Sequence, residues 1–284
     1  MIYTQIFLVV RNRQVTNCTS VNTKIKTKRG KIEGFTQIVL GKEIITCLGI
    51  PYAEPPVGHF RFRKPVPKKA MERNKKNSEV RQIVSTANQG EDCFYLNAWI
   101  PQGGCKRKHT MVWIEGRGFV VADVARSNPK AIAAFTDTIV FTINYRAGPL
   151  GFLYIDHKES PGNIGLLDQS LAIKWIHDNV RKFGGRKHKI TFFGNSAGGA
   201  SVNYHMLSKF SRPYFQKAII QSGEAHSKKY FYSPSEALNA AYTFAADYSC
   251  NKTKVEETIK CLQSFPESFM RTLHATHMPR PPWF

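Results

Sequence analysis

The sequence predicts an α/β fold in which a mostly parallel central sheet follows an antiparallel hairpin. Two observations support this prediction. After residue 110, short strands rich in β-branched residues alternate with helical segments, and residues 33–50 form β-like runs on either side of Gly41 and Lys42. Strands that alternate with helices pack into a parallel sheet with both faces covered. The 284 residues, 42% of them hydrophobic, are enough to bury such a core.

Four segments are predicted to form the parallel part of the sheet. Residues 110–114 and 136–145 are apolar runs of the kind found in buried parallel strands. Residues 189–194 and 217–223 follow as two further strands, and residues 197–207 between them are predicted to form a helix. This strand–helix–strand order indicates a crossover connection between parallel strands.

A longer helix is predicted over residues 165–183. Leu167, Leu171 and Trp175 recur every fourth residue and form one apolar stripe. Gly184, which a second glycine follows, ends the helix, because glycine readily adopts the conformation of a helix C-terminus.

The chain carries a formal net charge of +21, and its basic residues fall into clusters. The clusters are residues 24–31, 61–76, 106–108 and 181–189. Such clusters suit nucleic acid, heparin-like polymers or an anionic membrane, but they also occur as a solvated basic surface. We favour the solvated surface, because no helix-turn-helix, zinc-finger, RRM or KH signature accompanies the charge. Nucleic acid is therefore not an expected partner.

The six cysteines include no Cys-x-x-Cys pair, so no metal site is expected. Cys250 and Cys261 lie 11 residues apart around a polar, helical-looking segment and could bridge. Asn17 and Asn251 each begin an Asn-x-Thr sequon, and the second lies beside this candidate disulfide. A sequon beside a disulfide favours the secretory pathway, and thus a secreted glycoprotein.

Residues 1–20 are interpreted as a degenerate signal peptide or a disordered segment, with a first strand as the alternative. The apolar run at residues 6–10 is short, Arg11 and Arg13 follow it at once, and no basic region precedes it. No window approaches 18 consecutive apolar residues, so no transmembrane segment is predicted.

The segment GNSAG at residues 194–198 matches the G-x-S-x-G pattern. The pattern alone arises by chance in about one chain in ten of this length. Here a predicted strand precedes it and a predicted helix follows, as a nucleophile elbow requires. Ser196 is therefore the candidate nucleophile, and the backbone N–H of Ala197 is a candidate donor to the oxyanion. Further donors are expected from the loop that follows residues 110–114.

Seven motifs follow one another along the chain. They are GIPYAEPPVGHFRF (49–62), EDCFYLNAWIP (91–101), WIEGRGF (113–119), NYRAGPLGFL (144–153), GNIGLLDQSLAIKWI (162–176), FFGNSAGGASV (192–202) and AIIQSG (218–223). Together they resemble the type-B carboxylesterase and cholinesterase family, which has the α/β-hydrolase fold. The resemblance implies that residues 21–284 are the N-terminal portion of such a domain. It also implies hydrolysis of a small carboxylic ester through an acyl-enzyme on Ser196, without a cofactor, and a disulfide between Cys250 and Cys261.

The resemblance further implies two structural ion pairs that connect loops to the sheet. Arg146 is expected to pair with Asp168, and Arg61 with Glu91. Partly buried arginine–carboxylate pairs of this kind position loops more than they stabilise the fold. From the residues alone, these four side chains would be interpreted as surface charges.

The expected oxyanion loop departs from the family pattern of a histidine or tyrosine followed by three glycines. Here the loop is Glu115-Gly116-Arg117-Gly118. Gly118 and Ala197 remain expected donors, whereas Arg117 is expected to donate poorly, because a side chain disfavours the backbone conformation that glycine allows. Glu115 adds a negative charge where an oxyanion needs a positive potential.

Two further positions differ from the family. The segment between Arg61 and Glu91 contains no cysteine, so Cys93 lacks its usual partner. Arg186 replaces an aspartate that usually follows the two glycines at the helix end.

The other two members of the catalytic triad are not identified in the sequence. The family order is serine, then acid, then histidine, at distances well beyond the 88 residues (284 − 196) that follow Ser196. His205 is expected to pack or to face solvent, and His274 and His277 lie in a proline-rich segment. We therefore expect an incomplete chain that lacks the C-terminal strands and helices of the fold and has little activity by itself. The alternatives are a non-catalytic cholinesterase-like binding or adhesion protein and, less favoured, a basic polyanion binder.

Overall fold

The computed structural model describes residues 21–27, 30–69, 90–104, 106–122, 124 and 127–266. The strands are β1 (Lys24–Thr27), β2 (Gly30–Glu33), β3 (Phe35–Val39), β4 (Lys42–Pro51), β5 (Tyr95–Pro101), β6 (Lys108–Ile114), β7 (Ile139–Ile143), β8 (Tyr154–His157), β9 (Ser160–Pro161), β10 (Gly185–Asn195) and β11 (Lys217–Gln221). The helices are α1 (Lys130–Thr136), α2 (Gly148–Phe152), α3 (Ile164–Asn179), α4 (Ala197–Leu207), α5 (Pro234–Asp247) and α6 (Val255–Ser264), with short 3-10 turns η1 (Gly58–Phe60), η3 (Arg117–Phe119), η5 (Val180–Phe183) and η6 (Arg212–Tyr214). The segment 1–20, interpreted above as a degenerate signal or disordered segment, lies outside the described residues.

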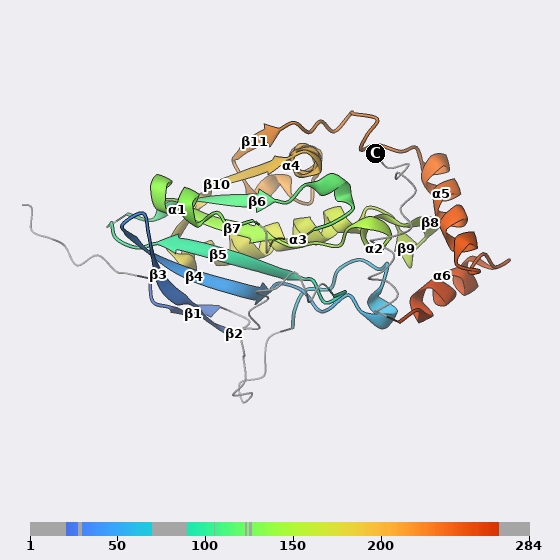
Figure 1. The fold of residues 1–284 in the computed structure, drawn as a ribbon, viewed down its shortest axis with the longest axis horizontal. Helices are drawn as coiled ribbons and strands as arrows, with labels where there is room; N and C mark the ends of the chain where they lie inside the picture. Colours follow the sequence, from blue (N-terminus) through green and yellow to red (C-terminus); the bar gives the residue numbers. More distant parts are fainter. Residues whose placement is uncertain are drawn as a thin grey trace, which may run out of the picture.

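The central sheet has seven strands in the order β11-β10-β6-β7-β5-β4-β3 (Figure 1). Strands β7, β6, β10 and β11 pair in parallel, whereas β3, β4 and β5 pair antiparallel, as do β5 and β7. The predicted fold class and the hairpin are confirmed, and Leu40 and Gly41 form its turn with positive φ angles. Strand β5 was not predicted, because it is buried on both faces and lacks the alternation of a half-exposed strand.

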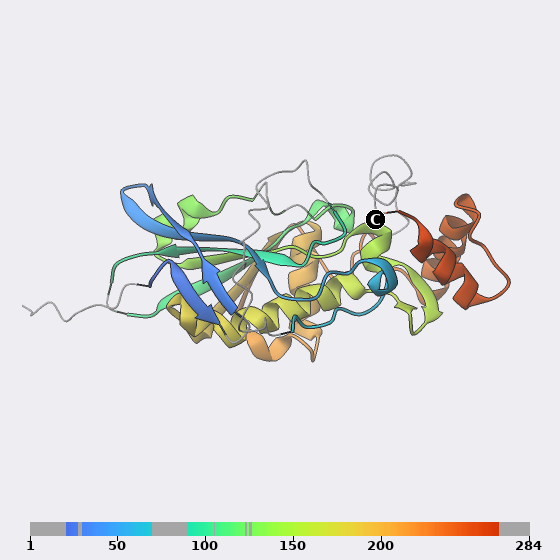
Figure 2. The ribbon, with the colours of Figure 1, turned by 90° about the horizontal axis from the view of Figure 1, so that it is seen from below.

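Neighbouring residues of each strand point to opposite faces of the sheet, and each face has its own core. Phe141 and Phe192 belong to the larger core, with residues of α3, α4 and the β1–β2 hairpin. Val140 and Phe193 pack with residues of α1 in a smaller cluster. Figure 2 shows α3 and the β1–β2 hairpin on one side of the sheet and α1 on the other. The helices therefore cover both faces, as the sequence predicts.

The predicted helices are confirmed, with small changes at their ends. Helix α3 continues into η5, and Gly184 follows with a φ of 83° in the left-handed conformation of a helix end. Helix α4 has the predicted bounds. The strand predicted at residues 136–145 begins only at Ile139, because Thr136 ends α1 and Asp137 turns the chain with a φ of 55°.

Helices α5 and α6 form a separate cluster at the right of Figure 1. Ser233 caps α5 in a capping box with Glu236, which satisfies backbone donors at the helix start. The Cys250–Cys261 disulfide connects the end of α5 to α6, with an S–S distance of 2.02 Å. The cluster packs against Phe62, so the α5–α6 pair is held by the loop that follows η1.

Strand β11 lies at one edge of the sheet, where four of its five residues are exposed. Ile219 and Ile220 are 44% and 38% exposed. The strand ends at Gln221 rather than at residue 223, because Ser222 has a positive φ of 51°. None of the helices in the described residues combines the length and the hydrophobicity that a membrane span requires.

Candidate active site

Ser196 lies at the turn between β10 and α4 and has a strained backbone. Its φ and ψ are 56° and −125°, a region that costs a residue with a side chain on the order of 1–3 kcal/mol. Two hydrogen bonds hold this conformation: the Ser196 N–H donates to the Gln221 carbonyl at 2.8 Å, and the Ala200 N–H donates to the Ser196 carbonyl at 2.9 Å. The turn therefore presents the half-buried Ser196 side chain at the end of the parallel strands.

Close backbone approach explains Gly198 of the GNSAG segment and Gly116 of the loop after β6. A Cβ atom on Gly198 would lie 2.2 Å from the carbonyl oxygen of Ile114, and one on Gly116 would lie 2.3 Å from the carbonyl oxygen of Asn195. Neither distance is compatible with a side chain. The loop after β6 is therefore packed directly against the Ser196 turn, and the structure brings residues 116–118 and Ser196 together.

The loop itself has three consecutive residues with left-handed backbone angles. Arg117, Gly118 and Phe119 have φ values of 55°, 66° and 61°. Arg117 thus adopts the conformation that its side chain disfavours, at a cost of about 1–2 kcal/mol. The Arg117 side chain is 41% exposed, and its Nε lies 3.6 Å from Oε1 of Glu115.

Two side chains donate hydrogen bonds to the buried carboxylate of Glu115. Its Oε2 accepts hydrogen bonds from Trp113 Nε1 at 3.0 Å and from the Ser127 hydroxyl. The Tyr145 hydroxyl donates to the Glu115 backbone carbonyl at 2.7 Å, and burial raises the pKa of Tyr145. The Trp113 and Ser127 hydrogen bonds and the nearby Arg117 compensate the negative charge of the Glu115 carboxylate beside residues 116–118.

Tyr230 is a site residue that the sequence analysis missed. Its hydroxyl lies 3.1 Å from the Ser196 hydroxyl, and its ring meets the Phe119 ring edge-to-face with centroids 5.9 Å apart. The Tyr204 hydroxyl donates to the backbone carbonyls of Ala225 and Tyr230 at 3.0 and 2.9 Å, which fixes this segment over the serine. No spacing or pattern in the sequence marks Tyr230, because it follows Ser196 by 34 residues in an irregular segment.

His205 packs inside the protein, as one of the two predicted alternatives states. Its Nδ1 lies 2.7 Å from the Ser211 hydroxyl and its Nε2 lies 2.8 Å from Oε1 of Gln169. Burial lowers the pKa of His205 to about 3, so the ring is neutral at neutral pH. Among the described residues, no histidine bonds to Ser196, and His274 and His277 lie outside them.

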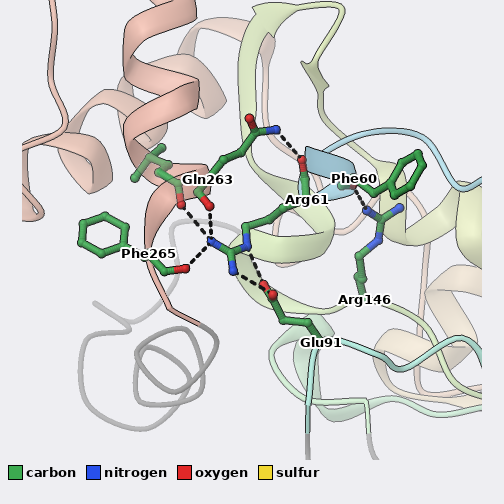
Figure 3. A network of polar contacts seen from close by, with 7 residues as sticks. Phe60, Arg61, Glu91, Arg146, Gln263 and Phe265 are labelled. Carbon is green, nitrogen blue, oxygen red and sulfur yellow. Dashed lines mark hydrogen bonds and ion pairs between the residues drawn. The ribbon is translucent and has the colours of Figure 1, made fainter. Parts of the chain in front are cut away.

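Arg61 connects three segments that are distant in the sequence (Figure 3). Its Nε and Nη2 donate to the two carboxylate oxygens of Glu91 at 2.6 and 2.7 Å. Its Nη1 donates to the carbonyls of Leu262, Gln263 and Phe265 at 3.2, 2.9 and 2.9 Å. Arg61 therefore donates hydrogen bonds to backbone carbonyls at the C-terminal end of α6.

Arg146 and Asp168 form the second buried ion pair. Nε and Nη2 of Arg146 donate to the Asp168 carboxylate at 2.8 and 2.6 Å, and the Arg146 backbone N–H adds a third bond at 3.2 Å. Burial opposes the charged guanidinium, but the Asp168 carboxylate outweighs it and raises the pKa of Arg146. The Phe60 carbonyl lies 3.5 Å from Nη1 of Arg146 and, by chain connectivity, joins this pair to Arg61 (Figure 3).

A strained serine turn, the loop of residues 116–118 packed against it and two buried arginine pairs are thus assembled around one sheet. A model of the carboxylesterase family matches residues 21–278. The chain belongs to the carboxylesterase family. This membership agrees with the fold, in which Ser196 follows a parallel strand and precedes a helix.

Three curated relatives extend the comparison. Acetylcholinesterase 4 of Caenorhabditis briggsae is 40% identical, and the match covers 84% of this chain and 43% of that protein. Cholinesterase of Mus musculus is 38% identical, over 87% of this chain and 45% of that protein. Acetylcholinesterase of Bungarus fasciatus is 36% identical, over 85% and 43%. The carboxylesterase-family chain therefore spans less than half the length of these relatives.

The remaining cysteines and the sequons of this carboxylesterase-family chain are placed as follows. Among the described residues, Cys47 and Cys93 form no disulfide, and burial raises the pKa of Cys47 to about 12 and that of Cys93 as well. Cys18 and Cys105 lie outside the described residues. Asn251 is exposed beside the disulfide, whereas Asn17 lies outside the described residues. Within the described ranges, no group of acidic, histidine or cysteine side chains could hold a metal ion.

Proposed function

We propose that this carboxylesterase-family chain carries the nucleophile and oxyanion donors of a serine hydrolase acting on small carboxylic esters. The observation that carries the proposal is the strained Ser196 turn with residues 116–118 packed against it. Hydrolases of this class need a nucleophile held at the end of a strand and backbone donors beside it.

The proposed reaction begins when the Ser196 oxygen attacks the ester carbonyl carbon and its proton passes to a general base. The negative oxygen of the tetrahedral intermediate accepts hydrogen bonds from the backbone N–H groups of Ala197 and Gly118, with Arg117 as a weaker third donor. The intermediate collapses, the alcohol leaves with a proton, and an acyl-enzyme remains on Ser196. Water then attacks the acyl carbon and releases the carboxylic acid.

The base is the component that the described residues do not supply. In the described structure, the Ser196 hydroxyl bonds to the Tyr230 hydroxyl, while both ring nitrogens of His205 are occupied elsewhere. A serine hydroxyl without a base is a poor nucleophile at neutral pH. We therefore expect the 284-residue chain alone to hydrolyse esters negligibly.

Chemical rescue tests the proposal. The purified chain is incubated with p-nitrophenyl butyrate over a range of imidazole concentrations, beside a Ser196→Ala variant that reports the hydrolysis catalysed by free imidazole. We expect negligible serine-dependent turnover without imidazole and a clear rise with it, because imidazole replaces the missing base. Serine-dependent turnover without imidazole would contradict the expected inactivity. No serine-dependent rise at any concentration would contradict the esterase proposal.

A non-catalytic binding or adhesion protein is the second candidate. Two observations favour it. Arg117 lies in the proposed oxyanion loop with a strained backbone, and the Tyr230 hydroxyl forms a hydrogen bond with the Ser196 hydroxyl. Such a protein would show no rescue by imidazole, and intact-mass spectrometry would find no fluorophosphonate adduct on Ser196. An adduct that disappears in Ser196→Ala would exclude this candidate.

We also propose that the chain passes through the secretory pathway and carries a glycan on Asn251. The support is a disulfide beside an exposed sequon asparagine. Expression in a secreting eukaryotic cell should give a protein whose gel mobility increases after glycosidase treatment. Asn251→Gln should remove at least part of this shift, and an unchanged shift would contradict the assignment.

A further inference from the structure

Three of the four basic clusters of the sequence meet at one pocket of about 500 Å³. The pocket is lined by the β1 segment, by the loop before β6 and by the end of η5, which lie far apart in the sequence. We call it the basic pocket, and its main cationic residues are Lys26, Lys106, Arg107, Lys108, Arg181 and Lys182. No aspartate or glutamate is among its lining residues.

Most of these positive charges are not neutralised inside the protein. Lys108 is the exception, since its Nζ lies 2.7 Å from Asp137, and at the rim Lys24 lies 3.5 Å from Glu33. Lys26, Lys106, Arg107, Arg181 and Lys182 are exposed, and no described carboxylate forms an ion pair with them. Several unpaired cations around one concave surface create a positive potential that attracts an anion with several charges.

The basic pocket lies at the opposite end of the parallel strands from Ser196. Lys108 begins β6, whereas Ile114 ends it next to the oxyanion-type loop. Six residue steps at about 3.3 Å each place the two sites roughly 20 Å apart. An anion bound in the basic pocket would therefore leave the serine site open.

The lining residues distinguish among the classes of polyanion. Phe183 is the aromatic residue of the lining and is fully buried, so no ring is available to stack on the bases of single-stranded nucleic acid. Ile25 and Ile100 are buried too, and Val21 is half-buried against the core, so the lining offers no large exposed apolar side chain for insertion into a membrane. Asn22 and Gln102 instead add amide groups that suit sugar hydroxyls.

We propose that the basic pocket binds a short segment of a sulfated polysaccharide. Sulfate groups would pair with Lys106, Arg107, Arg181 and Lys182, while hydroxyl groups would bond to the polar lining. The volume lies in the range of small-ligand clefts, which suits an oligosaccharide rather than a rigid duplex. The Cys250–Cys261 disulfide agrees with an oxidising environment of the kind in which such polymers occur.

The test measures binding of a heparin hexasaccharide to the full chain by calorimetry at low and moderate NaCl. The variant Lys106→Ala/Arg107→Ala/Arg181→Ala/Lys182→Ala removes four charges from the basic pocket. The control Lys158→Ala/Lys209→Ala/Lys252→Ala/Lys260→Ala removes four exposed charges outside it. We expect the affinity to fall by at least about tenfold in the variant, and only slightly in the control, because direct contacts outweigh net charge.

Two comparisons decide the ligand class. The two comparison probes are a single-stranded oligonucleotide of equal charge and vesicles containing phosphatidylserine. Both should bind more weakly than the hexasaccharide. For each probe, the affinity should change by a similar factor in the variant and in the control. Equal losses of hexasaccharide affinity in variant and control would overturn the proposal, and so would tighter binding of the oligonucleotide or the vesicles.

If the variant does not fold, lysine acetylation of the unchanged chain provides the readout. The hexasaccharide should protect Lys106 and Lys182 but not Lys158, and equal protection would overturn the assignment.

Discussion

Strands β6 and β10 run in parallel, and their two ends are built from different interactions. At the carboxyl ends, backbone atoms approach so closely that Gly198 and Gly116 leave no room for a Cβ atom. At the amino ends, exposed lysines and arginines surround an open pocket. The carboxyl ends therefore depend on close backbone packing that leaves no room for an added atom, and the amino ends on exposed positive charge. The carboxyl end should be sensitive to any added volume and insensitive to salt, and the amino end should show the reverse.

The largest expected difference in the free energy of unfolding is between the substitution of a buried arginine and that of an exposed one. Arg61, which lies with η1 toward the carboxyl ends, is 3% exposed and pairs with Glu91, whereas Arg181 in the basic pocket is exposed. Arg61→Ala should lower the free energy of unfolding by about 3–5 kcal/mol, because it removes the guanidinium that forms two short hydrogen bonds to the buried Glu91 carboxylate. Arg181→Ala should change it by less than about 0.5 kcal/mol. Urea unfolding followed by circular dichroism measures both, and similar losses would contradict the contrast.

Two glycine-to-alanine substitutions, one near each end of the strands, make the same comparison, because each adds one methyl group. A Cβ on Gly198 would meet the Ile114 carbonyl oxygen at 2.2 Å, whereas one on Gly103 would meet nothing within 4 Å, although its φ is 82°. Gly198→Ala should cost about 3 kcal/mol or more through overpacking, and Gly103→Ala about 1–2 kcal/mol through its backbone angle alone. Thermal and urea unfolding of the two variants provide the measurement. A smaller loss for Gly198→Ala would show that the turn can relax.

The buried His205, in the last turn of α4, gives the stability of the fold a pH dependence. The folded pKa of about 3 lies below the ordinary value of 6.5, so the unfolded chain takes up a proton first as the pH falls. The free energy of unfolding should therefore decrease from about pH 6.5 toward pH 3, by up to about 1.4 kcal/mol per unit. Unfolding at several pH values should show this slope in the unchanged chain and in the exposed control His188→Gln, and a shallower slope in His205→Gln. Equal slopes in all three would contradict the assignment.

Tyr230 gives the smallest expected effect. Tyr230→Phe removes the hydroxyl that bonds to Ser196, so a fluorophosphonate should label Ser196 faster by about two- to tenfold, the range of one neutral hydrogen bond. Tyr232→Phe, in the same segment, is the matched control and should leave the rate unchanged. The labelling rate is followed by intact-mass spectrometry in the presence of imidazole. A slower rate in Tyr230→Phe would mean that the tyrosine assists the serine instead of occupying it.

The sequence predicts the elements of this fold better than the contacts between them. Helix α4 and the turn at Ser196 follow from local patterns, because glycine, serine and apolar spacing determine backbone conformation over a few residues. The contact between Tyr230 and Ser196 has no local signal, since an irregular segment places it. Likewise, the resemblance predicts that Arg61 pairs with Glu91, but nothing in the sequence indicates that Arg61 also caps α6.

The contacts of Arg61 have a consequence for the order of folding. Its bonds to the end of α6 join residues separated by 201 to 204 positions in the chain. Closing a loop of that length costs more chain entropy than forming the hairpin of β3 and β4 or the neighbouring strands β6 and β7. We therefore expect helix α6 to dock after the sheet has assembled, and its amide hydrogens to exchange through partial openings that leave β10 intact.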